Sequence, residues 1–171
     1  MAIPFPIIIT ERLTLREILL SDIDRIHFFR TDKAINKFIK RDPQTREMTI
    51  AFIEKVTANM RNNKCYNWGI STKESNELIG TICLWNFSED KKTAEVGYDL
   101  DPQFHGKGIM SEALKAVLNF ALTRGGFKIV QAYTDYRNFP SKKLLKQHGF
   151  IPNPNIQDSD NQNNEVFYLK F

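Results

Sequence analysis

The segment 93–113 constrains the fold more than any other part of the sequence. Its first eight residues, TAEVGYDL, alternate apolar and polar positions, which is the period of a β-strand. Pro102 ends this strand, because proline has no amide hydrogen to donate to a sheet. The loop QFHGKG follows at 103–108, and apolar residues then recur at helical spacing over 109–121. The sequence therefore predicts a strand, a glycine-containing loop and a helix in immediate succession.

A junction of this kind is suited to binding an anion, and phosphate above all. The first turn of a helix leaves its amide hydrogens unpaired, and the helix dipole adds partial positive charge there. Gly106 and Gly108 matter because a side chain at either position would keep a phosphate from these amides. The loop lacks the GK[ST] ending of a P-loop and the third glycine of a dinucleotide fingerprint. We call residues 103–110 the phosphate loop and expect them to hold a pyrophosphate.

A second strand-to-helix junction lies about thirty residues further along the chain. Residues 128–134 (KIVQAYT) predict a strand, and Asn138 and Ser141 open a helix that Gly149 ends. If the helix between the two strands is a crossover, the strands are parallel. Asn138 and Ser141 would then lie beside the phosphate loop, although each residue also suits a purely structural role as a helix cap.

The remaining chain reads as a sheet with covering helices. Further strands are expected at 11–18, 65–72, 78–87 and 165–171, and short polar links between strands predict antiparallel hairpins. Ser21 and Thr45 are predicted to cap two helices, and a brief helical piece is expected at 34–39. The polar loop 152–164 is rich in proline and asparagine. We find no repeat or linker and expect one domain spanning residues 1–171.

Composition favours an ordinary globular protein, with 42% hydrophobic and 26% charged residues. No apolar run approaches the ~20 residues that span a bilayer, and the start MAIPFPIIIT lacks the basic region of a signal peptide. Cys65 and Cys83 lie in strand-like segments without metal spacing, as free thiols in a reducing compartment do. We therefore expect a cytoplasmic protein without membrane contact.

The histidines and the net charge give little information about function. Three scattered histidines, His27, His105 and His148, give no support for a metal site, and none is expected. The formal charge of +4 permits attraction to phosphorylated cofactors. An RNA-binding function would rest on this charge alone, since no patch of basic and aromatic residues supports it. Direct nucleic-acid binding is therefore not expected, while a homodimer is compatible with the sequence.

Four motifs occur in a characteristic order: TERLTLR at 10–16, EVGY at 95–98, QFHGKG at 103–108, and N-x-x-S…GF at 138–150. With these motifs the chain resembles the GNAT acetyltransferase superfamily over nearly its full length, and within it the ribosomal-protein N-acetyltransferases of the RimJ/RimL type. The resemblance implies an α+β fold with α/β/α layers. Its mixed, mostly antiparallel sheet would splay between the strands at 93–100 and 128–134.

The resemblance also implies a binding mode for acetyl-CoA, the acetyl donor. The pantetheine arm would lie in the splay and pair with the strand that ends at Leu100, and the phosphate-loop amides would hold the pyrophosphate. Asn138 would hydrogen-bond the pantetheine, and Ser141 would face the thiolate. The residues expected to bind acetyl-CoA are Tyr98, Asp99, Leu100, Gln103, His105, Gly106, Lys107, Gly108, Ile109, Met110 and Asn138.

The expected reaction is direct attack of an amine on the thioester, with Ser141 as the candidate to protonate the leaving sulfur. Glu95 is the first choice for a general base, and a structural carboxylate is its alternative role. An α-amine has a pKa of about 7.7–8.0, so a weak base or water suffices to deprotonate it. Lesser candidates for the base are Glu165, Asp135, Tyr133 and His105.

The acceptor is expected to be the N-terminal amine of a ribosomal or other protein. Two alternatives stay open, namely acetylation of a small amine such as an amino sugar, polyamine or drug, and a non-catalytic acyl-CoA-binding module. The residues that would discriminate between acceptors lie in 21–60 and 152–164. The acceptor is not identified from the sequence of these segments alone.

Overall fold

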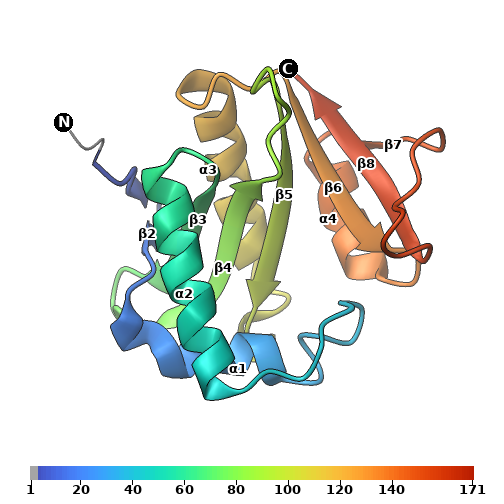
Figure 1. Cartoon of the computed structure of the whole chain (residues 1–171). Helices are drawn as coiled ribbons and strands as arrows, with labels where there is room; N and C mark the ends of the chain where they lie inside the picture. The colour runs from blue at the N-terminus through green and yellow to red at the C-terminus, as the bar shows by residue number, and fades with distance from the viewer. Residues whose placement is uncertain (1–3) are drawn as a thin grey trace.

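A computed structural model describes residues 4–171, so the first three residues of the apolar start lie outside it. It contains one eight-stranded sheet in the order β1-β2-β3-β4-β5-β6-β8-β7 (Figure 1). Only β5 and β6 run parallel, and every other neighbouring pair is antiparallel. The strands are β1 (Ile8–Ile9), β2 (Leu13–Glu17), β3 (Tyr66–Thr72), β4 (Leu78–Trp85), β5 (Thr93–Leu100), β6 (Ile129–Asp135), β7 (Ile151–Pro152) and β8 (Asn164–Lys170).

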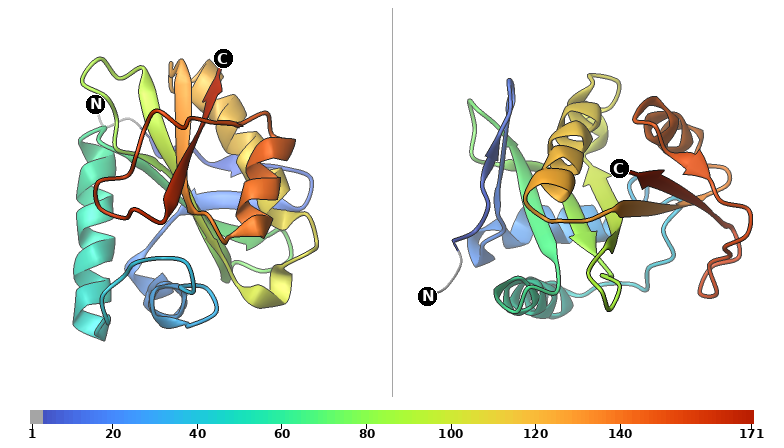
Figure 2. Two further views of the ribbon diagram at one scale, coloured as in Figure 1. Left: turned by 90° about the vertical axis from the view of Figure 1, so that its right-hand side faces the viewer. Right: turned by 90° about the horizontal axis from the view of Figure 1, so that it is seen from above.

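Helices cover both faces of the sheet. α1 (Ile23–Thr31) and α2 (Arg46–Arg61) lie on one face, and α3 (Ile109–Thr123) and α4 (Phe139–Gln147) lie on the other (Figure 2). Two short 3-10 turns, η1 (Leu20–Asp22) and η2 (Pro102–Phe104), precede α1 and follow β5. The predicted α+β fold with a mixed, mostly antiparallel sheet is confirmed. No helix within residues 4–171 is both long and apolar enough to cross a membrane.

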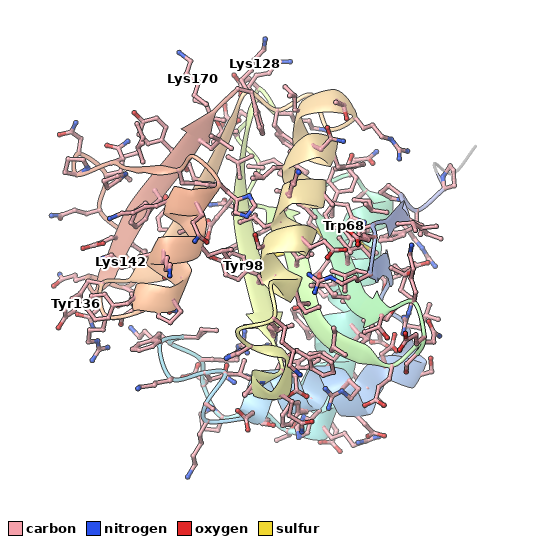
Figure 3. All side chains as sticks on the ribbon, turned by 180° about the vertical axis from the view of Figure 1, so that it is seen from behind. Trp68, Tyr98, Lys128, Tyr136, Lys142 and Lys170 are labelled. Atoms are coloured by element: carbon pink, nitrogen blue, oxygen red, sulfur yellow. The ribbon has the colours of Figure 1, made fainter. Side chains whose placement is uncertain are left out.

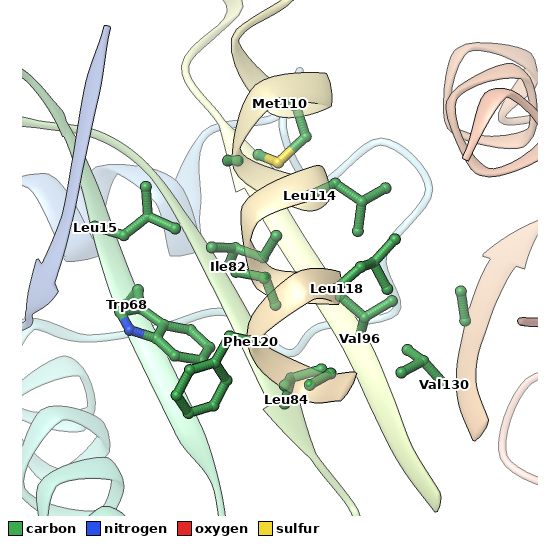
Figure 4. Close-up of a cluster of buried hydrophobic side chains, with 14 of the residues drawn as sticks. Leu15, Trp68, Ile82, Leu84, Val96, Met110, Leu114, Leu118, Phe120 and Val130 are labelled. Atoms are coloured by element: carbon green, nitrogen blue, oxygen red, sulfur yellow. The ribbon is translucent and has the colours of Figure 1, made fainter. Parts of the chain in front are cut away.

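The main core lies between the sheet and α3. The apolar residues of α3 that recur at helical spacing are buried, and Leu114 and Val117 are fully so. Figure 4 shows them packed on side chains of β2, β3, β4 and β5. Trp68 on β3 is also fully buried, and its ring lies 5.2 Å from that of Phe120. Trp68 is therefore a core residue, whereas Trp85 is 46% exposed on the opposite face of the sheet.

Two of the predicted helix starts have different outcomes. Thr45 does cap α2, because its hydroxyl accepts a hydrogen bond of 3.2 Å from the amide of Met48. The prediction for Ser21 is wrong, since Ser21 lies inside η1 and α1 begins two residues later. The carboxylate of Asp22 accepts instead from the amide of Leu19 and from Arg16 (2.8–2.9 Å). This anchor holds residues 20–22 in a tighter turn.

The brief helix predicted at 34–39 is absent from the described chain, which forms turns there. Asp32 accepts hydrogen bonds of 2.9 Å from the amides of Ala34 and Ile35. The side chain of Asn36 donates to two carbonyl groups, those of Phe29 and Asp32. The amides of Ala34 and Ile35 are those that a helix leaves unpaired at its start, so Asp32 caps a turn. Only the bonds from the amide of Asn36 to Asp32 (3.0 Å) and from that of Ile39 to Asn36 (3.1 Å) follow, and they do not extend this turn into a helix.

The sheet splays between β5 and β6. The two strands pair only where Thr93, Ala94 and Glu95 face Ile129, Val130 and Gln131. Beyond this point β5 remains paired with β4, and β6 remains paired with β8. The strands consequently diverge toward their C-terminal ends (Figure 1). The edge of β5 that faces β6 therefore has no strand partner from Val96 to Leu100.

Candidate active site

The phosphate loop joins β5 to α3 at the wide end of the splay. Gly106 and Gly108 both have φ +72°, a conformation that costs other residues about 1–2 kcal/mol. A Cβ atom added at Gly106 would meet no heavy atom within 4 Å, so the surface of the loop is open there. Gly108 is the residue that precedes α3. The loop thus presents a bare backbone at the N-terminus of a helix.

The free amides of the loop begin at Gly106. The first helical hydrogen bond of α3 runs from the amide of Glu112 to the carbonyl of Gly108 (3.0 Å), which leaves the amides of residues 109–111 without a helical acceptor. The amide of His105 is not available, because it donates to Pro102 (3.1 Å). The side chain of His105 is also engaged, since its Nε2 lies 3.0 Å from the carbonyl oxygen of Leu100.

Residues of the first sequence motif, TERLTLR at 10–16, form hydrogen bonds that anchor the end of the phosphate loop next to α3. The Glu112 carboxylate accepts hydrogen bonds from Thr10 Oγ1 (2.6 Å) and from the amide (2.8 Å) and Nε (2.6 Å) of Arg12. Arg12 Nη1 also donates to the carbonyl of Lys107 (2.9 Å). Burial alone would raise the pKa of Glu112, but these hydrogen bonds outweigh it and lower that pKa. The carboxylate is thus held in its charged form as an anchor for the loop.

Sequence reasoning missed this role of Thr10 and Arg12. The two residues served only as part of a family motif, and they lie about a hundred positions from Glu112. A second ion pair holds the other end of the loop, where Asp101 accepts from Arg25 (2.6 Å) and from the amide of Gln103 (2.9 Å). Both ends of the phosphate loop are consequently held by side chains from the first 25 residues of the chain.

A pair of hydroxyl groups lies in the splay, on the face of α3 and α4. Tyr98 Oη and Ser141 Oγ are 2.8 Å apart, and Figure 3 shows Tyr98 between the two helices. Burial raises the pKa of Tyr98 to about 12, so the phenol stays protonated and can donate. Asn138 caps α4 by accepting from the amide of Ser141 (3.2 Å). Sequence reasoning assigned only a backbone role to Tyr98, because nothing local indicates its contact with Ser141.

A carboxyl group lies on the opposite face of the splay. Side chains alternate along β5, so Glu95 and Asp99 point toward the face of α1 and α2, away from Tyr98. Burial raises the pKa of Glu95 to about 7, although Asn86 donates to it (3.3 Å) and opposes that shift. Burial also raises the pKa of Asp99, against the attraction of Arg41, whose Nη2 lies 3.7 Å away. Glu95 is therefore a carboxyl group that titrates near neutral pH.

Two of the lesser candidates for a general base are held in ion pairs. Asp135 accepts three hydrogen bonds from Arg137 (2.7–2.9 Å), which lower its pKa to about 2. Glu165 lies 2.7 Å from the ammonium group of Lys142. Tyr133 has a raised pKa, caused by burial and by the neighbouring Glu95. Within residues 4–171 no group of three His, Cys, Asp or Glu side chains could hold a metal ion.

Comparison with known proteins agrees with this geometry. The family model described as "Acetyltransferase (GNAT) domain" matches residues 12–151. An N-acetyltransferase named p20 from Bacillus licheniformis is 32% identical over 146 residues, which cover 82% of this chain and 80% of that protein. The ribosomal-protein-serine acetyltransferase of Escherichia coli is 34% identical over 80 residues, which cover 46% of this chain and 44% of that protein.

A solved structure confirms the fold over 96% of the chain. The structure described as RimL, the ribosomal L7/L12 alpha-N-protein acetyltransferase in complex with coenzyme A, has a TM-score of 0.84 at 20% identity. The match covers 96% of this chain and 98% of that chain. These findings define the class of the protein as an acetyl-CoA-dependent N-acetyltransferase. The chain belongs to the GNAT acetyltransferase family, as its four motifs predict.

Proposed function

We propose that this protein transfers the acetyl group of acetyl-CoA to the N-terminal amine of a protein or peptide. One observation carries the proposal, namely that β5 and β6 stop pairing after Glu95. This leaves a free strand edge between a hydroxyl pair on one face and a carboxyl group on the other. The two substrates can therefore meet in the splay from opposite faces of the sheet.

In this proposal acetyl-CoA binds on the face of α3 and α4. The backbone at Gly106 and Gly108 fits a pyrophosphate, because the amides of residues 106–111 have no hydrogen-bond acceptor and the space at Gly106 is open. The unpaired edge of β5 at Tyr98, Asp99 and Leu100 suits the amide groups of a pantetheine arm. Asn138 uses its Oδ1 as a helix cap, and its Nδ2 is the atom that would donate to the pantetheine.

The acceptor amine enters from the face of Glu95 and attacks the thioester carbonyl. Glu95 takes a proton from the amine as the C–N bond forms, and its pKa of about 7 suits a base at neutral pH. Amides of β5 beyond Glu95 stabilise the negative charge that develops on the carbonyl oxygen. The C–S bond then breaks and Ser141 donates a proton to the sulfur, while Tyr98 remains protonated and donates a hydrogen bond to the Ser141 oxygen. Glu95 then releases its proton to water, and Ser141 regains one from water. The products are an acetylated amine and free CoA.

An acceptor screen tests this proposal. The protein is incubated with acetyl-CoA and two matched panels, one of peptides with free N-termini and one of amino sugars, polyamines and other small amines. Products are identified by mass spectrometry, and release of the CoA thiol is followed with a thiol reagent. We expect acetylation of α-amines in peptides. Turnover of small amines alone would refute the peptide acceptor, and acetyl-CoA binding without turnover of any amine would refute catalysis.

A further inference from the structure

A basic cavity lies at the end of β6, on the face of the sheet that carries Glu95. This cavity has a volume of about 200 Å³ and lies where the segment 37–40 meets the first residues after β6 and the loop 152–164. Figure 1 shows the segment that joins α1 to α2 reaching across the wide end of the splay toward this place. The cavity is lined by Lys37, Phe38, Ile39, Lys40, Asp135, Arg137, Asn161 and Asn163.

Positive charge in this cavity exceeds negative charge. Asp135 is its only carboxylate, and Arg137 already neutralises it with hydrogen bonds of 2.7–2.9 Å. Lys37 and Lys40 have no carboxylate within ion-pair distance among the described residues. The only hydrogen bond of Lys40 there is a long one of 3.4 Å to the carbonyl of Asp160. Two ammonium groups thus remain without a counter-charge.

The aromatic ring of Phe38 lies close to two cations of the cavity. Lys37 Nζ lies 5.2 Å, and the guanidinium carbon of Arg137 5.8 Å, from the centre of the Phe38 ring. The ring therefore brings two cations to one place through cation–π contacts. The wider segment 30–46 contains six basic and two acidic residues, so its net charge is +4. This equals the formal net charge of the entire chain. Such a concentration attracts anionic partners over several ångströms of solvent.

The cavity lies on the same face as Glu95 and at a defined distance from it. Gln131 pairs with Glu95, and alternation along β6 places Tyr133 and Asp135 on that face. The rise from Gln131 to Asp135 is about 13 Å at roughly 3.3 Å per residue. An extended peptide whose amine lies at Glu95 would reach the cavity with its third to fifth residue. A free acidic amino acid is too short to do so.

We propose that this cavity is a specificity subsite that binds an acidic side chain near the N-terminus of a peptide acceptor. The inference rests on the proposed acetylation of peptide N-termini and adds a substrate class to it. Lys37 and Lys40 are the residues that would contact the carboxylate, and Phe38 and Arg137 complete the wall. The subsite selects among peptides and leaves the chemistry at Glu95 and Ser141 unchanged.

Matched peptides test the subsite. One series has Asp or Glu at position 3, 4 or 5, and a second series has Asn or Gln at the same position, with all other residues identical. Because a partly exposed ion pair contributes up to about 1 kcal/mol, we expect KM to be roughly fivefold lower for the acidic series. The advantage should shrink with added salt, and free aspartate and glutamate should gain nothing.

Variants locate the effect. Lys37→Glu with Lys40→Glu should abolish or reverse the preference, while the KM for acetyl-CoA stays unchanged. Lys33→Glu is the matched control, because Lys33 is an exposed lysine of the same segment that does not line the cavity. Equal use of acidic and neutral peptides, or a preference that survives in the double variant, would overturn the subsite and leave the proposed function intact. Acetylation of small amines alone would overturn both.

Discussion

A substitution at Gly106 tests the phosphate loop most directly. In Gly106→Ala the new Cβ meets no heavy atom, so the cost to the fold is that of a left-handed backbone, about 1–2 kcal/mol. For a domain of this size we expect Tm to fall by roughly 2–8 °C. The methyl group also stands where a phosphate must approach the amides. Loss of one hydrogen bond to a charged oxygen costs about 1.5–3 kcal/mol, which weakens acetyl-CoA binding roughly 10- to 100-fold.

Gly126 provides a matched control. It follows α3 at the opposite end of that helix, has φ +71°, and likewise leaves open space for a Cβ. Gly126→Ala should therefore lower Tm by a similar amount while leaving the Kd for acetyl-CoA unchanged. Binding is measured by calorimetry and stability by thermal denaturation. If Gly106→Ala binds acetyl-CoA as tightly as Gly126→Ala does, the assignment of the phosphate loop is wrong.

Three further predictions concern the remaining parts of the site. Ser141→Ala should lower kcat roughly 10- to 100-fold without changing acetyl-CoA affinity, and unchanged kcat would remove Ser141 from the mechanism. Arg12→Ala should raise the KM for acetyl-CoA about fivefold but not the KM for S-acetylpantetheine, which lacks the phosphates; equal effects on both donors would contradict the anchoring role. In Glu95→Gln, a plot of log kcat/KM against pH should rise with slope one below pH 7, because only the acceptor amine still has to lose a proton. The native protein should show slope two, because ionisation of Glu95 near pH 7 adds a second step, and identical profiles would exclude Glu95 as the base.

The sequence predicted the elements of the site because their signals are local. Alternation identified β5 with its observed bounds, Thr93–Leu100, and the glycines and helical spacing identified the start of α3. The helix between β5 and β6 predicted that these strands run parallel, as they do. Asn138 was recognisable as a cap because a capping side chain and its amide lie three residues apart. Each of these features depends on neighbours within one element.

Only the tertiary structure decided which side chains meet. Sequence spacing does not bring Tyr98 to Ser141 or Arg12 to Glu112, because these contacts depend on how the strands are ordered and where the sheet splays. The pKa of Glu95 is also set by the fold, since it depends first on burial and also on the charge of Asp158, which is distant in the chain. The glycine-containing stretch after β5 was thus predictable from its own residues as a strand-to-helix junction, for which phosphate binding is our proposal. Its anchors, its facing hydroxyl pair and the basic cavity nearby exist only because folding brings separate segments together.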